Sequence, residues 1–207
     1  MSSPRTLGVV LFPGFEVLDV FGPLEIFGNM RAREHFRTCT VAATSGPVES
    51  AQVARAVADH GFDDAPTLDM LLVPGGIGTR TEVDNAALLD WLRRRAATAE
   101  IVMSVCTGAA LLARAGLLDG LKATTNKFAF HWVASQGPNV DWVRQARWVD
   151  AGKFVTSSGV TAGIDMSLAV VARLHGTELA EMLATFAEHE WHRDPGWDPF
   201  AKVHGLV

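Results

Sequence analysis

A cysteine stands where a short apolar run gives way to small, helix-forming residues. Cys106 follows the apolar segment 101–105 and precedes the segment 109–113, an order that predicts a strand, a sharp turn and a helix. This is the arrangement of a nucleophile elbow with cysteine in place of serine, and Ser104 and Gly108 are small enough for its turn. At the start of the helix, the dipole would lower the pKa of the thiol and favour the thiolate. The alternative is a small buried core residue, which is common for free cysteine.

A glycine-rich loop follows a second apolar run. Residues 74–78 read Pro-Gly-Gly-Ile-Gly, and consecutive glycines let the backbone approach a ligand closely. This loop could supply one N–H of an oxyanion hole, with the N–H of Thr107 as the other. The alternative is an ordinary tight turn. A dinucleotide site is disfavoured, because Thr81 stands where the third glycine of that fingerprint belongs.

One carboxylate stands in apolar surroundings near the N-terminus. Asp19 has Val17, Leu18, Val20 and Phe21 as neighbours. It is expected either to cap a helix or to be buried with a raised pKa. A protonated carboxyl beside a thiolate could donate a hydrogen bond and then shuttle protons.

The remaining candidates favour structural roles. Cys39 lies within a predicted strand, and His131 and His175 lie on helical patterns. The segment 189–192 (His-Glu-Trp-His) is one residue short of the zinc signature H-E-x-x-H, and we interpret it as a polar helix end. Three bulky aromatic residues nearby are expected to cover a core edge or a dimer surface: Trp191, Trp197 and Phe200.

Composition limits the possible classes of protein. The 207 residues correspond to one domain at about 150 residues per domain. A net charge of -5 without a Lys/Arg run argues against binding to nucleic acid or anionic lipid. No run of apolar residues is long enough to span a membrane, and the segment 7–12 is too short for a signal peptide. The chain has only two cysteines, so we do not expect a disulfide scaffold. We expect a cytoplasmic location.

Short β-branched runs alternate with helical patterns along the chain, which predicts a mostly parallel α/β sheet covered on both faces. Ligands bind at the carboxyl ends of such strands, which are expected after Phe12, Val73 and Val105. Strands are expected at 7–12, 36–43, 53–58, 69–73 and 101–105, with a hairpin at 148–150 and 153–156. Helices are expected at 19–30, 85–99, 107–118, 128–135, 160–175 and 178–191.

Several motifs in this order resemble the ThiJ/PfpI superfamily, which includes the parkinsonism-associated deglycase. They are Phe12-Pro13 with Asp19 and Gly22-Pro23, Val73-Pro74-Gly75-Gly76, the Cys106 elbow, and the segments 116–120, 123–125 and 158–165. Cys-Thr-Gly at the elbow and Gly-Val-Thr-Ala-Gly-Ile-Asp most resemble the isocyanide hydratase branch. Sensor domains of certain AraC-type regulators share the pattern, but this chain is expected to end too early for their helix-turn-helix domain.

The resemblance implies a flavodoxin-like three-layer sandwich, usually a homodimer, without a metal or an organic cofactor. It implies a single ThiJ/PfpI-like (class I glutamine amidotransferase-like) domain over residues 1–207. Cys106 would be the nucleophile, Asp19 the acid/base group and Thr107 its neighbour, contributing N–H and hydroxyl. The expected substrate-binding residues are Gly75, Gly76, Ile77, Asn126, Gly159 and Val160.

Two departures from relatives bear on the activity. Proteases and glyoxalases of the superfamily typically have His after the nucleophile, or Glu at the position of Asp19, whereas this chain has Thr107 and Asp19. Isocyanide hydratases typically have Thr-Thr-His after the elbow helix, where this chain has Thr124-Thr125-Asn126. Asn126 can form hydrogen bonds but cannot take up a proton near neutral pH.

The leading hypothesis is hydration of an isonitrile to an N-substituted formamide through a Cys106 thioimidate, with Asp19 moving the protons. A glyoxalase or amidase on the same scaffold is the first alternative. The second is a non-enzymatic redox sensor, since an exposed thiolate of low pKa oxidises readily. The third is a ligand-binding or interaction module that keeps the elbow only as scaffold. All of the enzymatic alternatives act on a small-molecule substrate.

Overall fold

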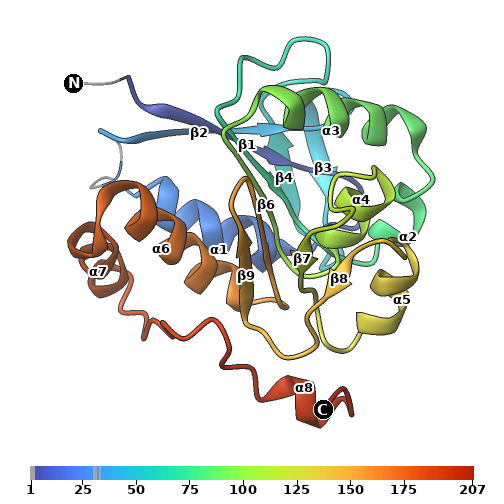
Figure 1. Ribbon diagram of the computed structural model, residues 1–207. Coiled ribbons are helices and arrows are strands. Elements are labelled where there is room, and N and C mark those ends of the chain that lie inside the picture. Colours follow the sequence, from blue (N-terminus) through green and yellow to red (C-terminus); the bar gives the residue numbers. More distant parts are fainter. Residues whose placement is uncertain (1–2, 30–31, 33) are drawn as a thin grey trace.

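A six-stranded sheet forms the centre of the molecule in a computed structural model that describes residues 3–29, 32 and 34–207. Its strands lie in the order β2-β1-β5-β6-β10-β9, and Figure 1 labels β2, β1, β6 and β9 of this sheet. All neighbouring strands pair in parallel except β9, which is antiparallel to β10. The bounds are β1 Arg5–Val10, β2 Phe36–Val41, β5 Met70–Val73, β6 Ile101–Ser104, β9 Trp148–Ala151 and β10 Phe154–Ser157.

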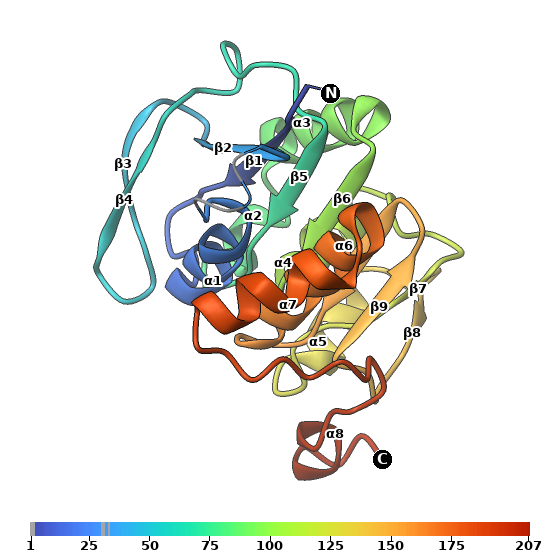
Figure 2. The same cartoon turned by 90° about the vertical axis from the view of Figure 1, so that its left-hand side faces the viewer.

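Helices cover both faces of this sheet (Figure 2). One group consists of α1 (Val17–Phe27), α6 (Ala162–His175) and α7 (Thr177–Phe186), and in it α6 packs against both α1 and α7. The other group contains α2 (Thr79–Glu82), α3 (Ala86–Thr98), α4 (Gly108–Arg114) and α5 (Phe130–Ser135). Because both faces are covered, β5 and β6 are buried along their whole length, as is typical of parallel sheets. The predicted α/β sandwich of the flavodoxin type is confirmed.

The chain adds strands to the sheet first on one side of β1 and then on the other. From β1 the chain passes to β2 on one side, and later to β5 and β6 on the other side. The carboxyl ends of β1, β5 and β6 therefore lie next to one another, as the sequence predicts. In doubly wound sheets, ligands bind in the crevice at this change of direction.

The predicted hairpin of β9 and β10 is confirmed, but other small sheets were not fully anticipated. The expected strand at 53–58 is β4 (Arg55–Ala58), and it pairs with β3 (Gly46–Glu49), which has no clear sequence signal. These two strands project from the body of the molecule as an arm (Figure 2). β7 (Lys122–Ala123) and β8 (Asp141–Trp142) are only two residues long, too short to leave a pattern.

The last predicted helix is wrong in its extent. It was expected over 178–191, whereas α7 ends at Phe186, and Glu188 has a φ of 48°. A left-handed residue cannot continue a right-handed helix. The segment 189–192 therefore lies in irregular chain after the helix rather than at a helix end. The chain then runs to α8 (Phe200–Val203). Among the described residues, no helix is long and apolar enough to cross a membrane.

Candidate active site

The backbone at Cys106 makes the sharp turn expected of an elbow. Its φ is 57°, in the left-handed region that a side chain seldom adopts, and its N–H donates to the carbonyl of Ser158 at 3.1 Å. Gly108 fits the turn because a Cβ there would lie 2.2 Å from the carbonyl oxygen of Val73. Strain of this kind persists only when the surroundings hold it in place. The residue between β6 and α4 is thus fixed by its neighbours.

Asp19 lies fully buried in α1, and it does not cap the helix, whose N-cap is Glu16. Its Oδ2 atom accepts a hydrogen bond from the N–H of Gly75 at 2.8 Å. Within the described chain its Oδ1 atom has no well-formed hydrogen bond, but the carboxyl is close enough to the Cys106 thiol for the thiol to affect its pKa. Of the two sequence interpretations, the buried carboxyl is therefore confirmed.

Burial dominates the protonation of both groups. It raises the pKa of Asp19 well above its usual value, against the opposing hydrogen bond from Gly75. Burial also raises the pKa of the Cys106 thiol, and the negative charge of Asp19 adds to this rise, while the N–H of Thr107 opposes it. The expectation of a thiol pKa lowered by the helix dipole is therefore wrong in direction, because removal from water outweighs the dipole here.

The glycine loop is used differently from what the sequence suggests. The N–H of Gly75 binds Asp19, and the N–H of Gly76 donates to the Thr107 hydroxyl at 3.0 Å. The Gly76 N–H is therefore already engaged and does not serve as a free oxyanion donor. Gly76 has a φ of 125°, and a Cβ there would lie 2.4 Å from the carbonyl oxygen of Gly14. The loop thus anchors the carboxyl and the hydroxyl.

A pocket of about 220 Å³ opens above Cys106. Six of the residues singled out in the sequence touch or approach it together: Cys106, Thr107, Gly76, Ile77, Asn126 and Val160. Three others do not line it. Gly75 is buried behind the elbow, where a Cβ would lie 2.5 Å from the Thr107 nitrogen, and Gly159 lines a neighbouring pocket. The third is Asp19, which is fully buried and is not among the lining residues.

Sequence reasoning missed four further residues that line this pocket: Glu16, Arg80, Phe128 and Ala129. The carboxylate of Glu16 accepts two hydrogen bonds from the Gln52 amide, at 2.7 and 2.8 Å. The Arg80 guanidinium lies over the Trp132 ring, 3.4 Å from its centroid. No motif joins these positions, although a cation directly after a glycine loop is a signal that could have been noticed.

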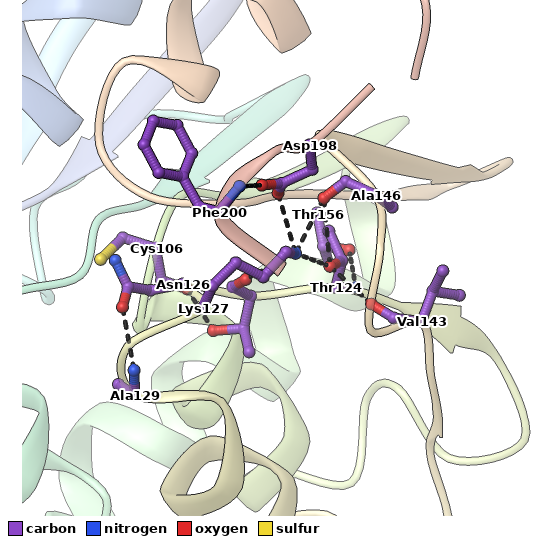
Figure 3. Close-up of polar contacts among 11 residues, drawn as sticks. Cys106, Thr124, Asn126, Lys127, Ala129, Val143, Ala146, Thr156, Asp198 and Phe200 are labelled. Carbon is purple, nitrogen blue, oxygen red and sulfur yellow. Dashed lines mark hydrogen bonds and ion pairs between the residues drawn. The ribbon is translucent and has the colours of Figure 1, made fainter. Parts of the chain in front are cut away.

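Asn126 and Lys127 follow the elbow helix and point in different directions (Figure 3). Asn126 lines the pocket and accepts a hydrogen bond from the Ala129 N–H at 3.0 Å. The Lys127 side chain is directed away from Cys106, and its ammonium forms a buried ion pair with Asp198 at 3.2 Å. Lys127 therefore joins the C-terminal segment to the wall of the site and does not face the pocket.

The other sequence candidates lie apart from the pocket. Burial raises the pKa of Cys39 to about 11, in keeping with a structural role. His189 contacts the buried carboxylate of Asp165 at 2.8 Å, and Asp165 also pairs with Arg147. In the part of the chain that the structure describes, no three His, Cys, Asp or Glu side chains form a group that could hold a metal ion.

The aromatic residues of the tail differ in their surroundings. Trp191 packs against the hydrophobic core. Trp197 stacks on His192 with ring centroids 4.1 Å apart, and Phe200 is about half exposed. The sequence places two histidines on helical patterns. His131 is exposed on α5, whereas His175 is the last residue of α6 and lies beside His35.

Comparison with known proteins gives relatives of several kinds. Isonitrile hydratase from Pseudomonas putida is 33% identical over 184 residues, covering 88% of this chain and 78% of the relative. The HTH-type transcriptional regulator GbdR from Pseudomonas aeruginosa PAO1 is 29% identical over 191 residues, covering 91% of this chain. The chain spans only about half of that regulator's length, 52%.

Solved structures of similar proteins share the fold of this chain. A THiJ/PfpI family protein from Pseudomonas syringae superposes with a TM-score of 0.82 at 31% identity, covering 94% of this chain and 78% of its own. DJ-1beta from Drosophila melanogaster, at 19% identity, shares the fold with a TM-score of 0.78, over 91% of this chain and 100% of its own. Residues 5–173 match the DJ-1/PfpI family. The chain therefore belongs to the DJ-1/PfpI family.

Proposed function

We propose that this protein hydrates a small isonitrile to an N-substituted formamide, with Cys106 as nucleophile and Asp19 as the group that moves protons. The observation that carries the proposal is a buried carboxyl next to a thiol at the base of a small pocket. The similarity to an isonitrile hydratase supports the reaction type. A pocket of this size suits a small, largely apolar substrate.

The first half of the reaction forms a bond from sulfur to carbon. Because the raised pKa values keep the Cys106 thiol protonated near neutral pH, its proton passes to Asp19 as the sulfur attacks the terminal isonitrile carbon. Asp19 then gives that proton to the same carbon, which becomes the CH of a thioimidate. Asp19 accepts the proton as a carboxylate and ends this half as a carboxylate again, so the net charge of the site does not change.

The second half adds water. Asp19 takes a proton from water as the oxygen attacks the thioimidate carbon, and it passes this proton to the substrate nitrogen. The carbon now bears hydroxyl, NH and sulfur. When the carbon–sulfur bond breaks, the electron pair leaves with sulfur, the hydroxyl proton returns to sulfur through Asp19, and the formamide is released. A single buried carboxyl thus serves as base and acid in turn.

The pocket wall supplies binding groups for this reaction. The Thr107 N–H approaches the sulfur and stabilises negative charge on it. Ile77, Phe128 and Val160 offer apolar surface to the substrate. Asn126 can hydrogen-bond the substrate or the attacking water through its amide nitrogen, since its oxygen is engaged by Ala129.

The decisive experiment measures formamide production from an alkyl isonitrile by NMR. Cys106→Ala should remove turnover, because no other thiol lines the pocket among the described residues. Cys39→Ala is the matched control and should leave turnover unchanged, as Cys39 lies on β2. Full turnover in Cys106→Ala would refute covalent catalysis. Activity of the wild type on methylglyoxal but not on isonitriles would instead favour a glyoxalase.

A ligand-binding role is the second candidate, favoured by the raised thiol pKa and by the similarity to transcriptional regulators. In that case the pocket binds its ligand without chemistry, and the elbow is only a scaffold. Ligand-induced thermal stabilisation of both the wild type and Cys106→Ala, together with a lack of turnover, would support this role.

We further propose that residues 1–207 act as one domain and that two copies associate. The Lys127–Asp198 ion pair joins the C-terminal segment to the rest, which supports one domain. Two exposed apolar side chains on α1, Leu18 and Phe21, offer a surface for a second copy. Light scattering of the purified chain would report its mass, and a monomer at micromolar concentration would refute the dimer.

A further inference from the structure

One cation faces the reactive thiol, and it has little to bind within the protein. Arg80 lies at the second position of α2, directly after the glycine loop, and lines the same pocket as Cys106. Among the described residues its guanidinium makes one hydrogen bond, from Nη1 to the Thr79 hydroxyl at 3.3 Å. Arg80 forms no ion pair with any carboxylate of the described residues. Since a guanidinium has five N–H donors, most of its donors remain free for a ligand.

The guanidinium is also held in position. It lies 3.4 Å from the centroid of the Trp132 ring, a contact in which the ring face attracts the cation. Stacking of this kind leaves the N–H groups at the edge of the plane free for ligands. Because the side chain is already ordered, less conformational entropy is lost when a ligand binds.

Among the described residues, the pocket is also lined by one carboxylate, that of Glu16. Both oxygens of Glu16 accept hydrogen bonds from the Gln52 amide, so this carboxylate is already engaged within the protein. Burial lowers the pKa of Arg80, and negative charge at Cys106 raises it, which places the cation within electrostatic reach of the sulfur. An anionic group near Arg80 would therefore sit close to the reacting atom.

We propose that Arg80, stacked on Trp132, binds a carboxylate on the substrate, so that the preferred substrates are isonitriles that carry a carboxylate a few bonds from the reacting carbon. Arg–carboxylate pairs are often bidentate, which would also orient the isonitrile carbon toward Cys106. Arg80 is thus a specificity-determining residue of the pocket. The choice of isonitrile rests on the proposed function, whereas recognition of the carboxylate does not.

The first test uses two alkylating reagents that differ in charge. Iodoacetate and iodoacetamide both react when sulfur displaces iodide, so the ratio of their rates at Cys106 cancels changes in thiol reactivity. In Arg80→Gln this ratio should fall about tenfold, measured by mass spectrometry of the Cys106 peptide. Arg94→Gln removes an equal charge from an exposed position on α3 and should leave the ratio within about twofold.

Two further measurements keep this test independent of folding defects. In the wild type, the iodoacetate to iodoacetamide ratio at Cys106 should exceed that of free N-acetylcysteine amide. Arg80→Lys keeps the charge but loses the planar fork, and its ratio should fall between those of the wild type and Arg80→Gln. Equal ratios in the wild type and Arg80→Gln, or a wild-type ratio below that of the free thiol, would overturn the proposal.

The second test uses substrates. For 3-isocyanopropanoate, Arg80→Gln should raise KM about tenfold, while kcat/KM for the corresponding neutral amide stays within about twofold. An equal fall in kcat/KM for both substrates would overturn carboxylate recognition. If the wild type turns over neither isonitrile, the proposed hydratase function fails, and the alkylation ratio still decides whether Arg80 recognises a carboxylate.

Discussion

The Asp19 carboxyl and the Gly75 N–H meet at 2.8 Å and join the first helix to the glycine loop beneath the candidate nucleophile. This bond is buried, so its loss would leave a donor unpaired in a dry site. It also fixes one oxygen of the carboxyl, and the other oxygen is left for the neighbouring thiol. The geometry makes Asp19 both a support of the loop and the nearest proton carrier.

Asp19→Asn should separate these two roles. The amide oxygen can still accept the hydrogen bond from Gly75, so the fold should be retained, but an amide cannot shuttle protons. We expect turnover of an isonitrile to fall by about 10² or more, measured as initial rates beside circular dichroism. An unchanged rate would show that Asp19 is only structural.

The same variant should change how stability depends on pH. The pKa of Asp19 is raised in the folded state above its ordinary value of 3.8, so the folded state holds this proton more tightly than the unfolded state does. Its contribution to stability is therefore complete below about pH 4 and is lost as pH rises through the folded pKa. Urea unfolding should show this fall in the wild type and a flatter profile in Asp19→Asn. Parallel profiles would contradict the raised pKa.

Glu16→Gln should make Cys106 more reactive. The negative charge of Glu16 contributes to the raised pKa of both Asp19 and the Cys106 thiol, so removing it should lower the thiol pKa. The rate of iodoacetamide alkylation as a function of pH reports this value directly. Glu25→Gln is the matched control, because Glu25 is exposed further along α1. An equal decrease of the Cys106 thiol pKa in both variants would indicate an effect of net charge alone.

Gly108→Ala should destabilise the protein more than a glycine substitution elsewhere. The added Cβ would lie 2.2 Å from the carbonyl oxygen of Val73 and 2.7 Å from that of Pro74, and backbone atoms of the central sheet cannot move aside. We expect a loss of about 3 kcal/mol in the free energy of unfolding. Gly196→Ala meets only the Asp194 carboxylate at 3.3 Å and should change stability by about 0.5 kcal/mol or less. Similar losses in both would refute the steric account.

Asp198→Ala should loosen the C-terminal segment. It leaves the buried Lys127 ammonium without its ion-pair partner, at a cost of about 3 kcal/mol. Adding Lys127→Met to this variant should recover part of the loss, and a double-mutant cycle measures that coupling. Asp84→Ala removes an exposed ion pair with Arg114 and should cost about 1 kcal/mol or less. If the effects of the two substitutions on the free energy of unfolding simply add, Lys127 and Asp198 are not coupled.

Periodicity and turn residues predicted most of the central sheet and its helices. Small residues around Cys106 were sufficient to predict the elbow, whereas the acid among apolar neighbours at position 19 was compatible with either a helix cap or a buried carboxyl, and only the structure decides between them. The direction of the thiol pKa could not be predicted, because it depends on how completely the folded chain removes the sulfur from water. The stacking of Arg80 on Trp132 joins two helices that the sequence does not relate, so no local pattern reports it.

The side chains around the pocket mouth come from connecting segments rather than from the sheet. Ile77 follows β5, Arg80 belongs to the four-residue α2, Phe128 precedes α5, and Val160 follows β10. None of them lies in a strand of the central sheet or at the elbow itself. Ligand preference in this architecture is therefore free to diverge during evolution while the scaffold is conserved, and close relatives can differ in what they recognise.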